Sequence, residues 1–516
     1  MPAGEAVATV VRGLSPLLSL VPEDRSRFGE VHAIGRVHDP ALEEFLSMIF
    51  RCRRRKNSFA ERRMSKRPRI LRSQRKIIGP LEIVNPNAAG IDAGSEHHFV
   101  SVPEDRCEEP VRTFGTFTSD LHAIADWLTA CNITTVAIEA TGVYWIPLHE
   151  ILEQRGLKPK LVDSRSIGRR TKKTDILDCQ WIRQLHTHGL LDGAFRPPAA
   201  MLPLRAFTRQ RKMLIEYAAD HIRHMQKALD LMNVKLHLIV SDITGVTGLR
   251  IIRAIVDGQH DPAKLTEMRE SGCRATEQEF VQALSGNYRP EHLFALEQAV
   301  ALFETYQSKI AECDSQIVAT LASFEHSGEK KAPRARREKR RKNELHFDGR
   351  TLLYQLVGID LTVIPGLQAS SLLTVVSETG TDMSPWSDGH HFASWLALSP
   401  NNRITGGKPI RGQQRLIRPN RAAQVFRIAA QTLERAHCGL GAFFRRIRAR
   451  HGRQVAIKAT AHKLATIYYS MLKNRTEYRD PGEDYYEQRY RDNLLRSLTK
   501  NAATLGFALT PLQEVH

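Results

Sequence analysis

Several features that would restrict the class of protein are missing from this 516-residue chain. It has no run of eighteen or more apolar residues, which excludes a membrane-spanning helix. Its seven cysteines include no CxxC pair and no histidine spacing suited to zinc, so reduced thiols in a cytosolic protein are their simplest explanation. Nothing in the sequence indicates secretion. The chain is expected to be neither a membrane protein nor a disulfide-stabilised extracellular one.

Acidic residues are also few compared with basic ones. The chain has 56 Asp and Glu against 75 Lys and Arg, which leaves a net charge of +19. This balance favours a polyanionic partner, of which nucleic acid is the natural candidate. The alternative is a basic protein whose charge serves only its solubility.

At this length the chain exceeds one hydrophobic core, and two or three domains are expected. Residues 1–84 form a basic N-terminal extension with little periodicity, dense in charge at Arg51–Lys56 and Arg62–Lys76. We expect a solvated or disordered arm that contacts phosphates without reading bases. Met64 opens a stretch typical of a natural start, so residues 1–63 are interpreted as an over-extended beginning.

Residues 85–198 alternate between strand-like and helix-like segments. Ala89–Ser95 and His98–Val102 read as a hairpin, and Thr134–Ala140 is a β-branched strand. The helical patterns lie between the strands. This alternation predicts an RNase H-like mixed sheet flanked by helices.

Four acids of this region lie where they can gather. Asp92 and Glu139 stand at the ends of strands, and Asp175 and Asp178 share one face at the start of a helix. Oxygen ligands from several elements are what a hard divalent cation requires. The alternative is that Thr174 or Asp175 simply caps the helix and the acids favour its dipole.

Lys172 and Lys173 directly precede this helix. They could offset the repulsion between the carboxylates or hold a phosphate backbone, but a solvated basic loop is an equally good interpretation.

Residues 199–325 follow a helical period and predict a long antiparallel helical hairpin, with an insertion at about residues 241–288. A basic linker at 326–350 follows. Between Lys330 and Lys342, nine of thirteen residues are Lys or Arg, a composition typical of unstructured chain.

Residues 351–475 predict a mainly α-helical C-terminal domain, and residues 476–516 a solvated tail. Pro365 and Gly366 start a helix-hairpin-helix-like element whose turn amides can contact a nucleic-acid backbone. Further on, a glycine-rich basic loop suits a phosphate, and its candidate binding residues are Gly406, Gly407, Lys408, Arg411 and Arg415. Thr405 lies within this loop. Considered by itself, it is interpreted as a turn threonine whose hydroxyl forms a hydrogen bond with its own backbone.

The chain resembles the DEDD insertion-sequence transposases, a family that includes bridge-RNA-guided recombinases. Its N-terminal half resembles their RuvC-like domain in the motifs GIDAGS, AIEATGVYW and KTDILDCQW, which hold Asp92, Glu139, Asp175 and Asp178. Its C-terminal half resembles their transposase domain in Ile364–Gly366, WLALSPNNRITGG (Trp395–Gly407) and ATAHKL (Ala459–Leu464). The resemblance extends from about residue 85 to about residue 475.

The resemblance implies that the four acids are catalytic and bind a divalent metal, Mg²⁺ or Mn²⁺. It also implies a serine nucleophile that attacks the scissile phosphodiester and forms a covalent protein–DNA intermediate. Thr405 occupies the matching position here. A threonine hydroxyl can act as a nucleophile, although its methyl group restricts χ1 and crowds an in-line approach.

The function implied is that of an insertion-sequence transposase or recombinase in the bacterial cytoplasm, acting at the nucleoid. Its partners would be double-stranded DNA at donor and target sites, a structured noncoding guide RNA from the element, and copies of itself in a dimer or tetramer. Two alternatives stay open: a junction-resolvase-type metal-dependent nuclease without a covalent intermediate, and a catalytically lost RNA- or DNA-binding homologue. Thr405 favours the second alternative more than the first.

Overall fold

The computed structural model describes residues 81–164, 167–168, 174–325, 343–400, 404–405, 408–409 and 420–510. Most of the N-terminal extension and most of the basic linker lie outside these ranges. So do six predicted binding residues: Lys172, Lys173, Gly406, Gly407, Arg411 and Arg415.

A five-stranded mixed sheet forms the first folded region, in the strand order β3-β2-β1-β4-β5. Its strands are β1 (Ala88–Ala93), β2 (His98–Ser101), β3 (Val111–Phe114), β4 (Thr135–Glu139) and β5 (Lys158–Val162). Strands β1, β2 and β3 pair antiparallel, whereas β4 pairs parallel with both β1 and β5. The sheet confirms the RNase H-like fold that the sequence predicts.

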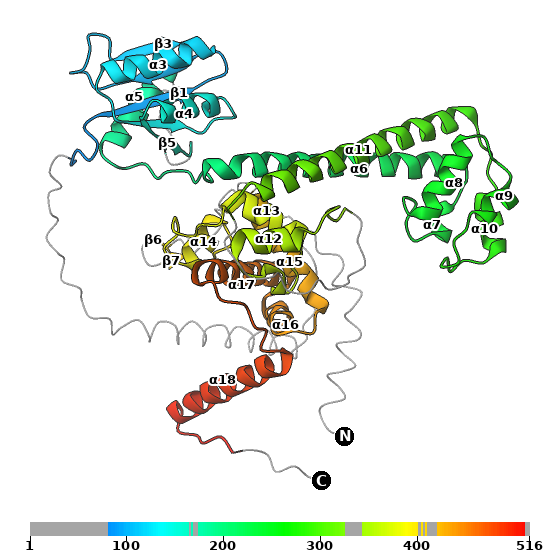
Figure 1. Cartoon of the computed structure of the whole chain (residues 1–516). Coiled ribbons are helices and arrows are strands. Elements are labelled where there is room, and N and C mark those ends of the chain that lie inside the picture. Colours follow the sequence, from blue (N-terminus) through cyan, green and yellow to red (C-terminus); the bar gives the residue numbers. More distant parts are fainter. Residues whose placement is uncertain are drawn as a thin grey trace, which may run out of the picture. The chain divides into compact units, whose positions relative to one another are not determined.

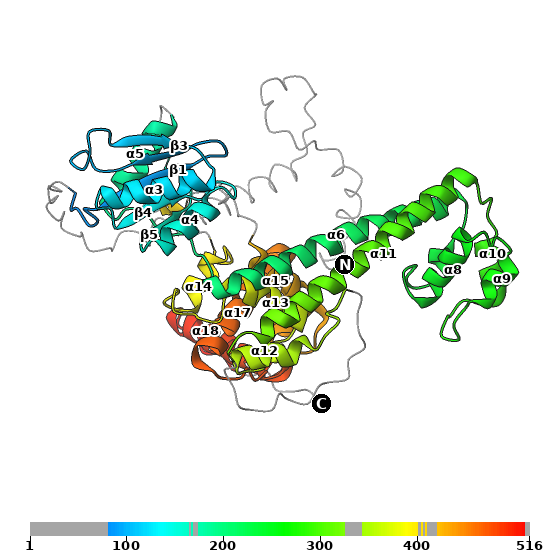
Figure 2. The same ribbon diagram turned by 45° about the horizontal axis from the view of Figure 1, so that its top comes forward.

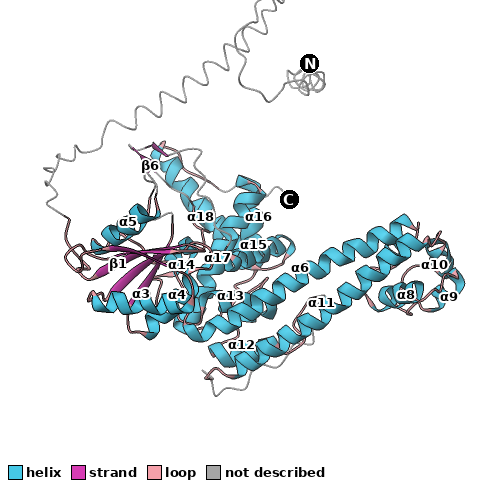
Figure 3. Ribbon diagram, turned by 90° about the horizontal axis from the view of Figure 1, so that it is seen from above, coloured by secondary structure: helices cyan, strands magenta, loops and turns pink. Residues whose placement is uncertain are grey.

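Helices cover both faces of this sheet, as Figure 3 shows. On one face, α3 (Thr118–Ala130) and α4 (Trp145–Gln154) bury Leu128 and Leu148 against Ile91 and Ile138. On the other, α5 (Asp175–Thr187) buries Ile182 against β4 and β5. Because side chains alternate along a strand, both faces of the central strands are apolar, and charged residues are left to the strand ends.

Two long helices form the predicted hairpin, α6 (Leu202–Leu231) and α11 (Pro290–Ala322), after the short 3-10 turn η1 (Ala199–Met201). They run side by side in Figures 1 and 2. Residue pairs far apart in sequence confirm the antiparallel direction, since Tyr217 meets Tyr306 with ring centroids 5.8 Å apart, whereas Arg211, nearer the start of α6, meets Asp314.

The insertion between the two long helices folds into a small helical subdomain. Its helices are α7 (Leu236–Ile239), α8 (Val246–Val256), α9 (Pro262–Glu267) and α10 (Glu277–Leu284). Ile251, Ile255 and Phe280 are fully buried there and pack with Leu229 of α6 and Leu296 of α11 in one core. The insertion is therefore a packed unit rather than a loop.

The C-terminal region is mainly helical, as predicted. Its elements are α12 (Gly349–Val357), η2 (Leu361–Val363), α13 (Ala369–Thr379), α14 (Gly389–Trp395), β6 (Ile404–Thr405), β7 (Lys408–Pro409), α15 (Arg421–Thr432), η3 (Leu433–Arg435), α16 (Gly439–His451), α17 (Arg453–Asn474) and α18 (Glu483–Thr504). Its core includes Leu204 of α6 and Ile317 of α11, so the base of the hairpin is part of it. No described helix has the length and apolar content of a membrane span.

Two details of this region can be compared directly with what the sequence predicts. Gly366 has φ +84°, which allows the turn before α13, and α13 ends at Gly380, also at positive φ. Residues 476–516, which the sequence predicts to be a solvated tail, contain the 22-residue helix α18, and most of its described residues are exposed. This helix packs on α16, where the Arg446 guanidinium lies 4.5 Å from the ring centroid of Tyr490.

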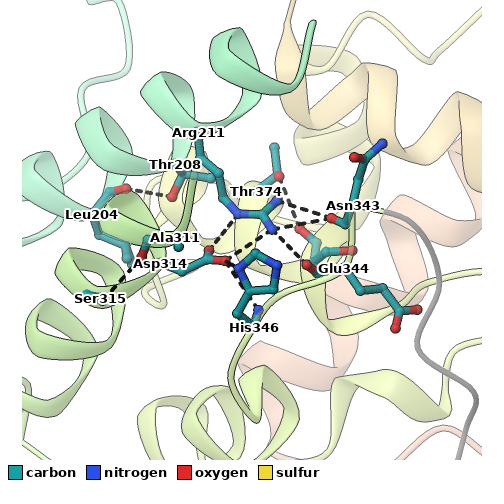
Figure 4. Close-up of polar contacts among 11 residues, drawn as sticks. Leu204, Thr208, Arg211, Ala311, Asp314, Ser315, Asn343, Glu344, His346 and Thr374 are labelled. Atoms are coloured by element: carbon teal, nitrogen blue, oxygen red, sulfur yellow. Dashed lines mark hydrogen bonds and ion pairs between the residues drawn. The ribbon is translucent and has the colours of Figure 1, made fainter. Parts of the chain in front are cut away.

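A buried ion pair of the hairpin also holds the start of the C-terminal region. Arg211 of α6 donates to Asp314 of α11 and to the backbone carbonyls of Asn343 and Glu344, where the chain enters the C-terminal region (Figure 4). The His346 backbone N–H also donates to Asp314, at 3.2 Å. One buried charge pair thus ties together three segments that are distant in sequence.

Candidate functional site

Two of the predicted acids stand at adjacent strand ends. Ile91 of β1 lies opposite Ile138 of β4 in the parallel register, so the next residues along, Asp92 and Glu139, emerge side by side. Both isoleucines belong to the core under α3 and α4. Because side chains alternate, Asp92 and Glu139 are assigned to the other face of the sheet, the one that α5 covers. Both are half-buried.

The other two acids lie in the first turn of α5. Thr174 is the N-cap of this helix, and its Oγ1 accepts a hydrogen bond from the Leu177 backbone N–H at 3.3 Å. Asp175 and Asp178 are therefore not needed as capping acceptors. They still benefit from the helix dipole, which favours negative charge at this end.

Three of the four acids meet. Asp92, Asp175 and Asp178 each place a carboxylate oxygen within 4.8 Å of the other two. Such a convergence of carboxylates at a partly exposed strand end suits a hard divalent cation, which takes oxygen ligands. Glu139 is not in this group among the described residues, although its strand end adjoins that of Asp92.

Gly90 makes this convergence possible. A Cβ atom at this position would overlap the backbone nitrogen of Arg183 and the carbonyl oxygen of Cys179, both in α5. The absence of a side chain lets the helix backbone lie directly on β1, two residues before Asp92. Gly90 begins the GIDAGS motif but was given no role on the sequence alone; its only signal was a glycine inside a strand, typical of close backbone approach.

The pKa of the neighbouring Cys179 thiol is affected by the negative charge of the acidic cluster. Burial first, and then the charge of Asp92, raise the pKa of Cys179 to about 12. The Cys179 side chain is fully buried and its Sγ contacts the Ile176 carbonyl oxygen at 3.1 Å. The thiol therefore stays protonated and packs as a small apolar group rather than reacting.

The predicted nucleophile lies on a short hairpin. Strands β6 and β7 pair antiparallel with Thr405 opposite Lys408, which leaves the two glycines, outside the described residues, between them. The side chains of Thr405 and Lys408 are likewise not described. The described backbone places Thr405 at the last strand position before the glycine pair.

Comparison with protein families agrees with this architecture. Residues 89–234 match the DEDD transposase model of the IS110 type, described as a transposase, and residues 360–443 match the transposase family IS116/IS110/IS902. No curated protein matches the chain. The fold and these two matches define a DEDD insertion-sequence transposase, a class of DNA recombination enzyme. Over these two stretches, the matches support the IS110 type of transposase family.

Proposed function

We propose that this transposase cuts and rejoins DNA strands using a divalent cation, Mg²⁺ or Mn²⁺, held by Asp92, Glu139, Asp175 and Asp178, with Thr405 as nucleophile. The observation that carries the proposal is the meeting of three of these acids within 4.8 Å in an RNase H-like domain. When bound, the cation would supply positive charge that stabilises the phosphodiester oxygens during the reaction.

The protein's own groups prepare this site. Thr174 caps α5 and thereby orients its first turn, and Gly90 lets that turn lie against β1. The three aspartates concentrate negative charge where a strand ends, so the site repels a phosphodiester unless a cation is present. Glu139 is proposed as the fourth ligand because it stands at the adjoining strand end.

In the chemical step, the Thr405 hydroxyl oxygen bonds to the scissile phosphorus and loses its proton. The bond from phosphorus to the leaving deoxyribose oxygen breaks, and that oxygen accepts a proton when it is released as a hydroxyl. The strand is then joined to the protein as a phosphodiester, and attack by another strand's hydroxyl reverses the step. Lys408, Gly406, Gly407, Arg411 and Arg415 are proposed to hold the phosphate by charge and close backbone approach, and Lys172 and Lys173 to contact the backbone near the acids.

A structured noncoding RNA from the element is proposed as the guide, acting in a dimer or tetramer of the chain. The net charge of +19 and the nine Lys and Arg residues between Lys330 and Lys342 support a second polyanion besides DNA. Sequencing the RNA that co-purifies with the protein tests this. We expect one enriched species from the element, and random cellular RNA would contradict the guide.

A suicide DNA substrate tests the nucleophile. In the presence of Mg²⁺ or Mn²⁺, the natural protein should form a DNA adduct that survives denaturation and maps to Thr405. Thr405→Ala should lose the adduct, whereas Thr405→Ser should keep it and react faster, because one crowding methyl group is removed.

The same substrate separates the alternative functions. Cleavage without an adduct, unaffected by Thr405→Ala, would instead indicate a junction-resolvase-type nuclease. Of these two alternatives, the extra methyl of Thr405 favours a catalytically lost binding homologue more than the nuclease. That function would be indicated by a natural protein that binds DNA but neither cuts nor links it, with activity gained in Thr405→Ser.

A further inference from the structure

Two basic side chains of the C-terminal region lie together without a compensating acid. Arg427 is on α15 and Lys458 is on α17, and both are half-buried. The two helices pack directly, with Phe426 against Tyr468 at a ring-centroid distance of 5.7 Å. Among the described residues, neither cation takes part in an ion pair or a hydrogen bond, unlike the arginines Arg448 and Arg453, which both pair with Glu434.

Unsatisfied hydrogen-bonding groups occur on the same two helices. The Nη2 atom of Arg427 is buried and has no partner among the described residues, and the same is true of the hydroxyl of Thr460, a fully buried residue of α17. Buried donors without partners are uncommon because each costs about 1–3 kcal/mol. Among the described residues, such a donor is available to an acceptor that arrives from outside the protein.

Electrostatics agree with this geometry. Burial first, and then the charge of Arg427, lower the pKa of Lys458. One turn further along α17, His462 lies with its ring centroid 5.4 Å from that of His390 on α14, so this part of the helix carries further nitrogen groups. A region that holds cations against their mutual repulsion is poised to receive an anion.

We infer that Arg427 and Lys458 form a binding site for one backbone phosphate of the DNA substrate. DNA is favoured over RNA because α15 begins at Arg421, sixteen positions along the chain from the proposed nucleophile Thr405. The site deepens the proposed function and rests on it. Arg427 supplies the directed N–H donors and Lys458 the second positive charge, an arrangement that holds a phosphate in a set position.

The test compares the full-length chain with Arg427→Gln and Lys458→Gln in two measurements. The first is binding to a labelled DNA duplex across a salt series with EDTA present, so that cleavage and the acidic site do not contribute. Each variant should bind about tenfold more weakly, as expected for a lost charged hydrogen bond, and its log–log salt slope should be smaller by about 0.9. Lys264→Gln, an exposed lysine of the insertion, removes the same charge and should leave both values unchanged.

The second measurement is thermal unfolding without nucleic acid. Removing one of two unpaired, half-buried cations relieves repulsion, so Arg427→Gln and Lys458→Gln should have a Tm equal to or above that of the natural protein. A purely structural arginine would behave in the opposite way, with a lower Tm and unchanged DNA affinity, and that pair of results overturns the inference.

Loss of affinity for the co-purifying RNA alone, with DNA binding intact, overturns the choice of DNA. Inorganic phosphate should raise the Tm of the natural protein more than that of Arg427→Gln. If phosphate instead competed equally strongly with DNA for the natural protein and for Arg427→Gln, that result would exclude the site.

Because EDTA suppresses the metal reaction, these results are independent of the Thr405 adduct. A normal adduct with unchanged binding of Arg427→Gln would reject the phosphate site and leave the proposed function standing. Weakened DNA binding of Arg427→Gln, together with no adduct in the natural protein, would support the phosphate site and reject the proposed function.

Discussion

Arg211 of α6 donates its Nε–H to Asp314 Oδ1 of α11 at 2.6 Å, and the two side chains are only 7% and 4% exposed. This pair stands at the base of the hairpin, next to the segment that enters the C-terminal region (Figure 4). Since both charges are buried, each depends on the other for compensation. The hairpin and the C-terminal region are thereby expected to unfold together.

We predict that Arg211→Met destabilises the protein by roughly 3–5 kcal/mol, because the buried charge of Asp314 loses its guanidinium partner and keeps only its contacts with His346. Arg211→Met combined with Asp314→Leu should recover part of this loss. Recovery should stay incomplete, since the carbonyls of Asn343 and Glu344 and the His346 N–H lose their partners. Denaturant unfolding of the four proteins of this double-mutant cycle measures the coupling, and strictly additive effects would contradict it.

Gly90→Ala should destabilise the first domain by about 1–3 kcal/mol, because α5 must move away from β1. The movement should also separate Asp92 from Asp175 and Asp178 and weaken the response to Mn²⁺ in thermal unfolding. Gly272→Ala is the matched control, since a Cβ there meets nothing within 4 Å. Equal behaviour of the two alanine variants would show that close helix approach does not build the site.

Asp178→Asn should abolish the rise in Tm that Mg²⁺ or Mn²⁺ produces, while the fold is kept. In metal-free buffer the variant should unfold at a higher temperature than the natural protein, because one of three mutually repelling carboxylates has been neutralised. Asp126→Asn, which alters an exposed carboxylate of α3, should keep the metal response. A full metal response in Asp178→Asn would remove Asp178 from the proposed ligands.

Glu378 of α13 gives a prediction about pH. Burial would raise its pKa, but hydrogen bonds from Arg209 at 2.7 Å and Arg205 at 2.9 Å outweigh burial and lower it. Because the folded pKa is depressed, the stabilisation is complete above the ordinary glutamate value of about 4.3 and is lost as pH falls through the folded value. At neutral pH, Glu378→Gln should cost about 2 kcal/mol, less than a fully buried pair because both arginines are partly exposed.

Unfolding measured from pH 7 down to pH 3 checks this: the stability difference between the natural protein and Glu378→Gln should shrink toward acid. Glu297→Gln, which alters an exposed glutamate of α11, should show a small difference at every pH. A Glu378→Gln difference that stays constant down to pH 3 would exclude the ion pair as its source.

Local sequence determined much of this protein. The β-branched run ending at Glu139 and the apolar stripe of α6 are read correctly because their periods arise from backbone geometry alone. The same holds for the start of α5, where Thr174 caps the helix by accepting a hydrogen bond from Leu177, only three residues further along the chain. The basic composition likewise indicated a nucleic-acid partner without any knowledge of the fold.

Tertiary structure decided which of these residues meet. Asp92 joins Asp175 and Asp178 only because β1 pairs with β4 in one register and α5 lies against Gly90, contacts between residues that are far apart in the sequence. The pairing of Arg211 with Asp314 and the proximity of Arg427 to Lys458 arise in the same way, through helices that pack across long stretches of chain. Even α18 depends on α16 for the cation–π contacts of Tyr490. Periodicity describes one element at a time, whereas these contacts depend on how the apolar faces of several elements are buried together, which no local pattern specifies.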